Sequence, residues 1–212
     1  MIRVARNFIF IAFLVPVCSA QAGMILESRL SSVTVSTYGG VVNPGTFYET
    51  QSTTSFDSWS ASIQSTAGAS GSASQSSWLT DSTLFMSGHT AIGGGAGHGG
   101  GQASSLMTVV FTIQEFHTFS YVGEVTQAWF GYATTRLTRI GGPVVIDSGF
   151  NFNREWTGIL EPGSYELSTQ LNCSDISGYF YGSATFTVVS VPSPAPVALL
   201  GFFFLRSLHR RR

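Results

Sequence analysis

Few residues of this 212-residue sequence have the types and spacing of a chemical site. His89 and His98 lie in the glycine-rich segment 88–101, where two imidazoles bind a metal ion only if further ligands join them. The segment also holds a G-x-G-x-x-G pattern from Gly95, which binds a dinucleotide only between a strand and a helix. No βαβ pattern surrounds it. We therefore predict an exposed loop with no metal and no cofactor.

Carboxylates and nucleophiles form no catalytic pattern either. The sequence has no G-x-S-x-G elbow, no H-E-x-x-H motif and no P-loop. The acidic residues of its second half stand singly, mostly beside turns: Glu115, Glu124, Asp147, Glu155, Glu161, Glu166 and Asp175. A glycosidase needs two carboxylates that face each other across a cleft, which this pattern leaves open. We predict that the protein is not an enzyme and has no catalytic residues.

The last residues, 192–212, contain three elements in a fixed order: a proline-rich break, an apolar run from Ala195 to Leu205, and a basic cluster. Prolines end strands and helices, and arginines suit the cytoplasmic flank of a membrane segment. As a helix, residues 197–208 would span roughly 18 Å, well short of the ~30 Å hydrocarbon core. We expect a short transmembrane helix that is cut rather than kept.

This ending resembles the PEP-CTERM sorting signal of Gram-negative bacteria, in which a proline–acidic–proline triplet precedes a short membrane stretch and an arginine-rich tail. Pro192, Ser193 and Pro194 stand at the triplet, with serine in place of the acidic residue, so the match is to a looser Pro-x-Pro variant. The resemblance implies a transient partner, the membrane protease exosortase, and a mature protein at the cell surface or in extracellular polysaccharide. The membrane stop would be the basic tail Arg206, Arg210, Arg211 and Arg212. A plain tail anchor is the alternative.

The N-terminal residues have the pattern of a secretory signal peptide. Two arginines precede an apolar run from Phe8 to Val17, and Ala20 and Ala22 form an A-x-A cleavage site. The run is too short to span a bilayer. We therefore expect an exported protein with a signal helix over 1–22, one domain over 23–191, and a sorting tail over 192–212 that holds the precursor in the membrane.

The domain between these segments is acidic and lacks lysine. All ten basic residues are arginines, and four of them lie within 23–191 against all 11 acidic residues, so its formal net charge is −7 where the whole chain has −1. Nucleic-acid binding needs clustered Lys and Arg, and the composition argues against it. Cys173 is the single cysteine of the domain, and its alternating surroundings predict a buried thiol rather than a nucleophile.

Hydrophobic residues of the domain alternate with a period of two, the period of a strand with one buried face. The predicted strands are 31–38, 56–63, 105–114, 117–125, 128–137, 143–146, 154–160, 164–173 and 179–191. Glycine and proline turns connect them, and the serine-rich stretch 65–77 reads as an exposed low-complexity or edge segment. We predict an all-β fold, a single antiparallel β-sandwich or jelly roll with Gly/Ser-rich loops.

The segment 158–167 (GILEPGSYEL) resembles a phrase of β-sandwich modules such as the bacterial pre-peptidase C-terminal domains. In those modules a Pro-Gly turn leads into the penultimate strand, and the resemblance implies a sandwich but no activity. Here Pro162 presets the turn and Gly163 accepts a positive φ, so Tyr165, Leu167 and Leu171 are expected to face the core.

The tryptophan and tyrosine residues of the domain bear on its function through their position in the core or at the surface. We expect most of these rings in the core and a few exposed where they could stack on sugars: Trp59, Trp78, Trp129, Trp156, Tyr132, Tyr179 and Tyr181. The expected function is that of a structural or adhesive protein of the cell surface or exopolysaccharide. The alternative is a carbohydrate- or Ca²⁺-binding module that uses exposed aromatics or turn carboxylates.

Overall fold

The computed structural model describes residues 23–42, 44–94, 97, 99–149, 154–175 and 177–191. The elements of this part of the chain are twelve β-strands, and it contains no helix, hence none that could cross a membrane. The expected signal helix over 1–22 and sorting tail over 192–212 lie outside the described residues and stay predictions.

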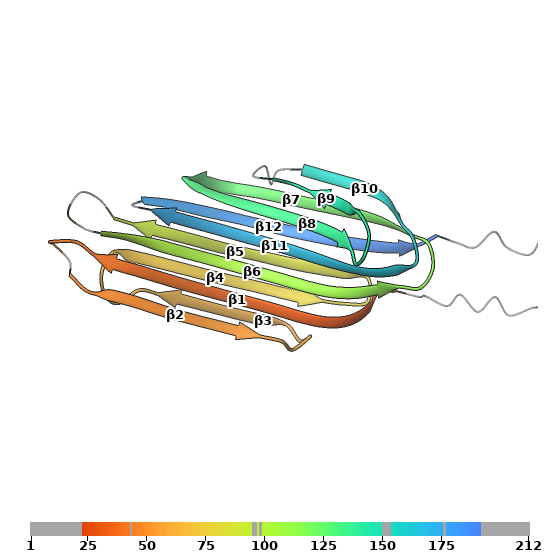
Figure 1. Ribbon diagram of the computed structural model, residues 1–212, viewed down its shortest axis with the longest axis horizontal. Helices are drawn as coiled ribbons and strands as arrows, with labels where there is room; N and C mark the ends of the chain where they lie inside the picture. The colour runs from red at the N-terminus through yellow and green to blue at the C-terminus, as the bar shows by residue number, and fades with distance from the viewer. Residues whose placement is uncertain are drawn as a thin grey trace, which may run out of the picture.

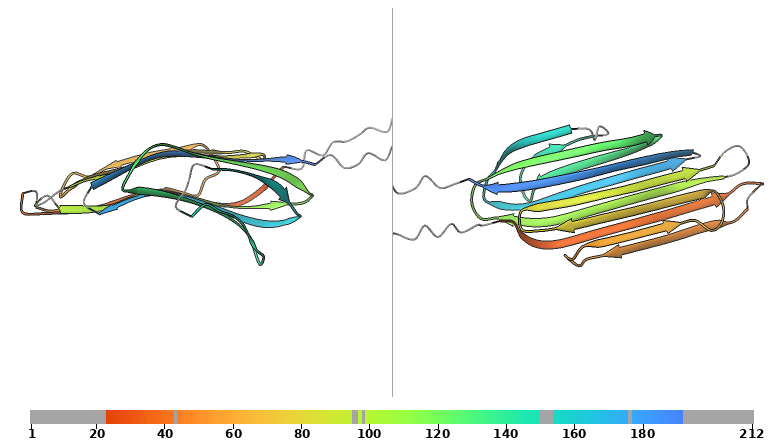
Figure 2. Two further views of the ribbon diagram at one scale, coloured as in Figure 1. Left: turned by 90° about the horizontal axis from the view of Figure 1, so that it is seen from above. Right: turned by 180° about the vertical axis from the view of Figure 1, so that it is seen from behind.

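The strands form two six-stranded sheets that lie face to face (Figure 1). Sheet A has the spatial order β2 (Thr46–Thr53), β1 (Ile25–Gly39), β6 (Gly99–Ile113), β11 (Gly163–Asp175), β8 (Gly131–Arg139) and β9 (Val144–Asp147). Sheet B has the order β10 (Arg154–Leu160), β7 (His117–Trp129), β12 (Ser177–Ser190), β5 (Thr83–Gly93), β4 (Ser70–Leu79) and β3 (Trp59–Gln64). Every paired neighbour is antiparallel. The predicted all-β antiparallel sandwich is confirmed, and Figure 2 shows its two curved layers from above.

The strands alternate buried and exposed side chains as the sequence pattern predicts. In β1, Val33 and Val35 are buried between the sheets, and β6 in the middle of sheet A buries every second residue, among them Val109 and Phe111. After the Pro162–Gly163 turn, three side chains of β11 point into the core as expected: Tyr165, Leu167 and Leu171. One buried face per strand is what a two-layer sandwich requires.

Aromatic rings hold the larger of two core clusters together across the sandwich. Phe111 of sheet A stacks on Tyr165 at 5.8 Å between ring centroids and packs against Phe186 of sheet B at 5.7 Å. The smaller cluster consists of smaller side chains: Val33, Val35, Ile63, Ala73, Ile92, Ala103 and Cys173. Cys173 is fully buried and free, which confirms the predicted buried thiol, and burial raises its pKa.

A buried arginine connects the two sheets at one side of the sandwich. Arg29 of β1 is only 3% exposed, and its guanidinium donates to Ser31 Oγ at 2.9 Å and to Ser77 Oγ of β4 at 2.6 Å. It also donates to the carbonyl oxygens of Ser55 (2.8 Å) and Asp57 (2.5 Å) in the connection between β2 and β3. Burial lowers the pKa of the guanidinium, and the nearby Asp57 charge opposes that shift. The single side chain therefore ties both sheets to the loop that joins them.

Three predicted segments differ in the structure. The serine-rich stretch 65–77 mostly forms β4, an inner strand whose Ala73 and Gln75 are buried. Most of the predicted loop 88–101 belongs to β5 and β6, which leaves only residues 94–98 between them. The predicted strand 128–137 is divided at Phe130, where the chain passes from β7 of sheet B to β8 of sheet A.

Candidate functional site

The residues expected to direct sorting and processing lie outside the described part of the chain: Ala20, Ala22, Pro192, Ser193, Pro194, Arg206, Arg210, Arg211 and Arg212. What the structure does place is the end of the folded domain. The closing strand β12 ends at Ser190, before the proline-rich part of the sequence begins. This position is expected, because proline has no N–H to donate to a neighbouring strand. The first strand begins and the last one ends at the same end of the sandwich (Figure 1).

The single carboxylates are spread over several strands and connections: Glu115 before β7, Glu124 in β7, Asp147 in β9, Glu155 in β10, Glu161 before β11, and Glu166 and Asp175 in β11. Glu161 forms an ion pair with Arg139 at 2.8 Å. Within the described residues, no three His, Cys, Asp or Glu side chains gather where they could hold a metal ion. His98 lies outside this part of the chain, whereas His89 is in β5.

A groove of about 690 Å³ crosses the outer face of sheet B. Its floor contains a row of serines that lie directly opposite one another on four adjacent strands: Ser60 of β3, Ser76 of β4, Ser87 of β5 and Ser183 of β12. A parallel row is formed by Ser62, Ser74, His89 and Tyr181. We call this floor, with both rows, the serine groove. It is a strip of hydroxyls bordered by two rings.

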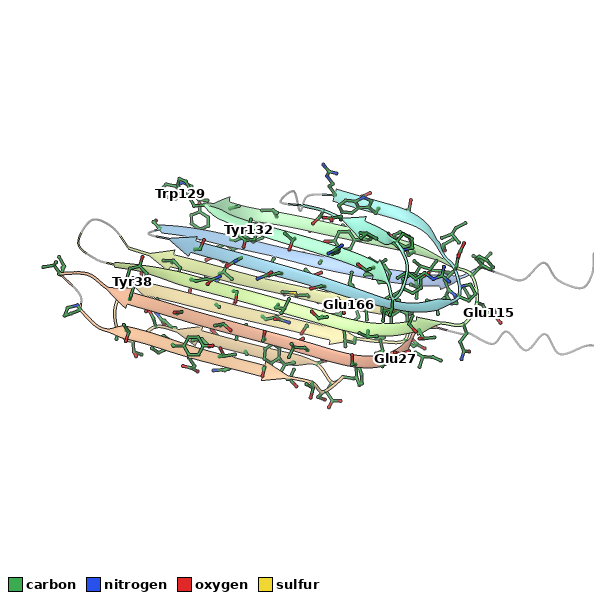
Figure 3. All side chains as sticks on the ribbon, in the orientation of Figure 1. Glu27, Tyr38, Glu115, Trp129, Tyr132 and Glu166 are labelled. Carbon is green, nitrogen blue, oxygen red and sulfur yellow. The ribbon has the colours of Figure 1, made fainter. Side chains whose placement is uncertain are left out.

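Aromatic rings continue from the serine groove toward one end of the sandwich. His89 stacks on Tyr181 with ring centroids 4.1 Å apart, Tyr181 contacts Tyr179 at 6.2 Å, and Tyr179 contacts Trp129 at 6.3 Å. We call these four side chains the aromatic row. Figure 3 shows that Trp129 lies at the end of the sandwich opposite Glu115 and Glu27. The row therefore points away from the end where the described chain starts and stops.

A β-bulge places Trp129 in this row. Up to Glu124 the even-numbered residues of β7 face outward, so simple alternation would turn Trp129 inward. The register of β7 against β12 shifts by one residue between Val125 and Gln127, which leaves Thr126 unpaired. After this bulge Trp129 is exposed and lies beside Tyr179. Bulges that redirect a side chain in this way are common next to functional sites.

The residue after Trp129 has an unusual backbone. Phe130 has a φ of +54°, the left-handed region that bulky residues rarely adopt, and it is 72% exposed while Trp129 is 57% exposed. Their rings lie 5.7 Å apart. Two large adjacent rings thus remain in contact with solvent at a strained turn, where burial in the core would have been more favourable.

Among the residues that the structure describes, no Asp, Glu, Lys or Arg lines the serine groove. Burial lowers the pKa of His89, which favours the neutral form of its imidazole. The nearest charged side chain along the same row is Glu124, directly opposite Ser183 on β7. The arrangement can form hydrogen bonds through hydroxyls and can stack flat, weakly polar molecules on its rings, but it offers no pair of groups for acid–base chemistry.

The expectation that the aromatic surplus lies mostly in the core is wrong for the seven rings considered. Trp59 and Trp156 are half-buried against the two core clusters, and Tyr132 and Tyr179 are half-buried at the surface. The exposed ones are Trp78, Trp129 and Tyr181. The core rings are instead Phe111, Tyr121, Tyr165 and Phe186. Sequence reasoning therefore missed the aromatic row, because its outward orientation depends on strand registers and on one bulge.

Comparison with known proteins identifies no family: no family model matches the chain, and no curated protein is similar to it.

Proposed function

We propose that the chain is an exported structural or adhesive protein of the cell surface or the exopolysaccharide, sorted through its C-terminal signal, and not an enzyme. The observation that supports it is the extent of the folded domain. Its strands run from Ile25 to Ser190, so the domain fits between the two segments whose patterns are those of a signal peptide and a sorting tail. The precursor is held in the membrane and is cut by an exosortase-type protease.

A second function is favoured by the serine groove and the aromatic row, namely binding of a carbohydrate by the sandwich. Neutral hydroxyls beside stacked rings suit a sugar polymer, and such binding would be the means by which the protein adheres to a matrix. The calcium-binding form of this alternative has less support, because the described carboxylates do not cluster.

Fractionation of producing cells tests the proposed location. The protein expressed from the unaltered sequence should be found at the cell surface or in the matrix and should be cut by protease added outside the cells. A variant that lacks residues 3–17 should stay inside, because it has lost the positive and apolar regions of the signal. Unaltered protein that remains in the cytoplasm would refute the proposal.

Deleting Arg210, Arg211 and Arg212 should release precursor from the membrane into the periplasmic or external fraction, because these charges hold the cytoplasmic end of a short apolar segment. The matched control replaces the same three arginines with lysine, which keeps the charge and should keep the precursor in place. The measurement is the ratio of membrane-bound to free precursor on immunoblots. An unchanged ratio in the deletion variant would show that the tail has no anchoring role.

A further inference from the structure

We infer that the outer face of sheet B binds a neutral polysaccharide, whose chain crosses the strands in the serine groove and continues over the aromatic row. The inference rests on the proposed surface function for its biological setting and deepens it by naming the ligand class. The site itself is argued from side chains that the structure places together.

The hydroxyls of the serine groove are available to a ligand. Within the described part of the chain, none of the six serine side chains forms a hydrogen bond: Ser60, Ser62, Ser74, Ser76, Ser87 and Ser183. A serine hydroxyl both donates and accepts, as a sugar hydroxyl does, so the two surfaces can satisfy each other in either direction. A protein partner would call for an apolar centre with aromatic and aliphatic anchors, and the floor here is polar.

The aromatic row adds stacking contacts to the hydrogen bonds that the serine hydroxyls can form. The C–H bonds on the flat face of a pyranose carry a small positive charge, and the face of an aromatic ring carries a negative one, so the two attract when they stack. His89 and Tyr181 stack on each other, so each covers one face of the other and leaves the second face for a ligand. The edge-to-face contacts of Tyr179 with Tyr181 and with Trp129 continue the row to the end of the sandwich.

The size of the site suits a polymer rather than a single sugar. The serine groove and the aromatic row together cross β3, β4, β5, β12 and β7, which is five strands. Neighbouring strands lie about 4.8 Å apart, so the site is roughly 19 Å wide across the sheet. The volume of about 690 Å³ is within the range of ligand pockets. Several sugar units in an extended chain would fill it.

The charge of the surroundings selects among polymers. Glu124 lies in line with the serine row, and the domain as a whole has a formal net charge of −7. An anionic polysaccharide would be repelled, whereas a neutral one meets neither repulsion nor a buried unpaired charge. The expected ligand is therefore uncharged.

Affinity electrophoresis of the full-length chain in mild detergent tests the inference. The gels contain a soluble neutral polymer (hydroxyethyl cellulose, a β-1,3-glucan or a galactomannan) or the anionic polymer alginate. We expect retardation by at least one neutral polymer and none by alginate. The Tyr181→Ala variant should bind that polymer about tenfold more weakly, because it loses the central ring. The matched control Tyr48→Ala removes an exposed tyrosine of β2 in sheet A and should bind normally.

A second variant guards against misfolding of the first. Ser87→Leu fills the floor of the serine groove with a bulky apolar side chain and removes a hydroxyl without removing a ring, and it should abolish retardation while circular dichroism stays unchanged. The inference is overturned if no neutral polymer retards the wild-type protein. It is also overturned if both variants are retarded as strongly as the wild-type protein. The wild-type protein could instead form dimers through this face. Dimers that bind no polymer and that the Tyr181→Ala variant does not form would also overturn the inference. Because the measurement uses purified protein, a failure of export in cells leaves it unaffected, so the two proposals fail separately.

Discussion

Replacing Arg29 with alanine should destabilise the folded domain by about 3 kcal/mol, a large part of the 5–15 kcal/mol that domains of this kind have. The guanidinium is buried and donates four hydrogen bonds, two of them to serine hydroxyls and two to the loop between β2 and β3. Its removal leaves a cavity and buried polar atoms without a donor. Lysine cannot restore the arrangement, since its ammonium lacks the planar fork.

Urea unfolding of residues 23–191, which contain all twelve strands, measures the effect. At a slope of roughly 2 kcal/mol per molar urea, the Arg29→Ala midpoint should fall by about 1.5 M. The matched control is Arg136→Ala, an exposed arginine of β8, which should stay within about 0.5 kcal/mol of wild type. If the two variants unfold at the same urea concentration, Arg29 does not tie the sheets together.

Replacing Phe111 with alanine should cost about 3–5 kcal/mol, the range for a large aromatic ring removed from a packed core. Phe111 is fully buried in the central strand of sheet A and contacts both Tyr165 and Phe186, so the cavity would open at the contact between the sheets. The same urea titration measures it, with Phe116→Ala as the control, because that ring is exposed before β7. A loss for Phe111→Ala no larger than that of the control would contradict the core described above.

The strands with one clearly apolar face were predictable from the sequence. In β1 and β11 large side chains such as Val33, Tyr165 and Leu167 alternate with polar ones, and only one register buries them all. β4 was missed because its buried positions are small or polar. Gly71 faces inward, and a Cβ there would lie 3.0 Å from Val35 and 2.7 Å from Thr37, so the close approach of sheet A requires a residue without a side chain. Composition alone suggested a loop.

The aromatic row was not predictable, because it arises from pairing between strands far apart in the sequence. Nothing near Thr126 marks a bulge, yet the bulge decides that Trp129 faces outward beside Tyr179. The turn at Phe130 is followed by a single glycine, Gly131, which does not interrupt the alternating pattern, so the predicted strand 128–137 ran across it. The predictions for residues 1–22 and 192–212 depend on short linear patterns rather than on strand pairing, and they lie outside the described residues.

The mass of the protein released from the surface of producing cells tests the central claim most directly. Export with signal removal and C-terminal sorting predicts a chain that begins at Gly23 and ends near Pro192 to Pro194. Mass spectrometry of the intact surface-associated protein, with peptide mapping of its two ends, gives both positions. A surface pool that still carries Arg212 would reduce the tail to a simple anchor, and a chain that still begins at Met1 would contradict export by a cleaved signal.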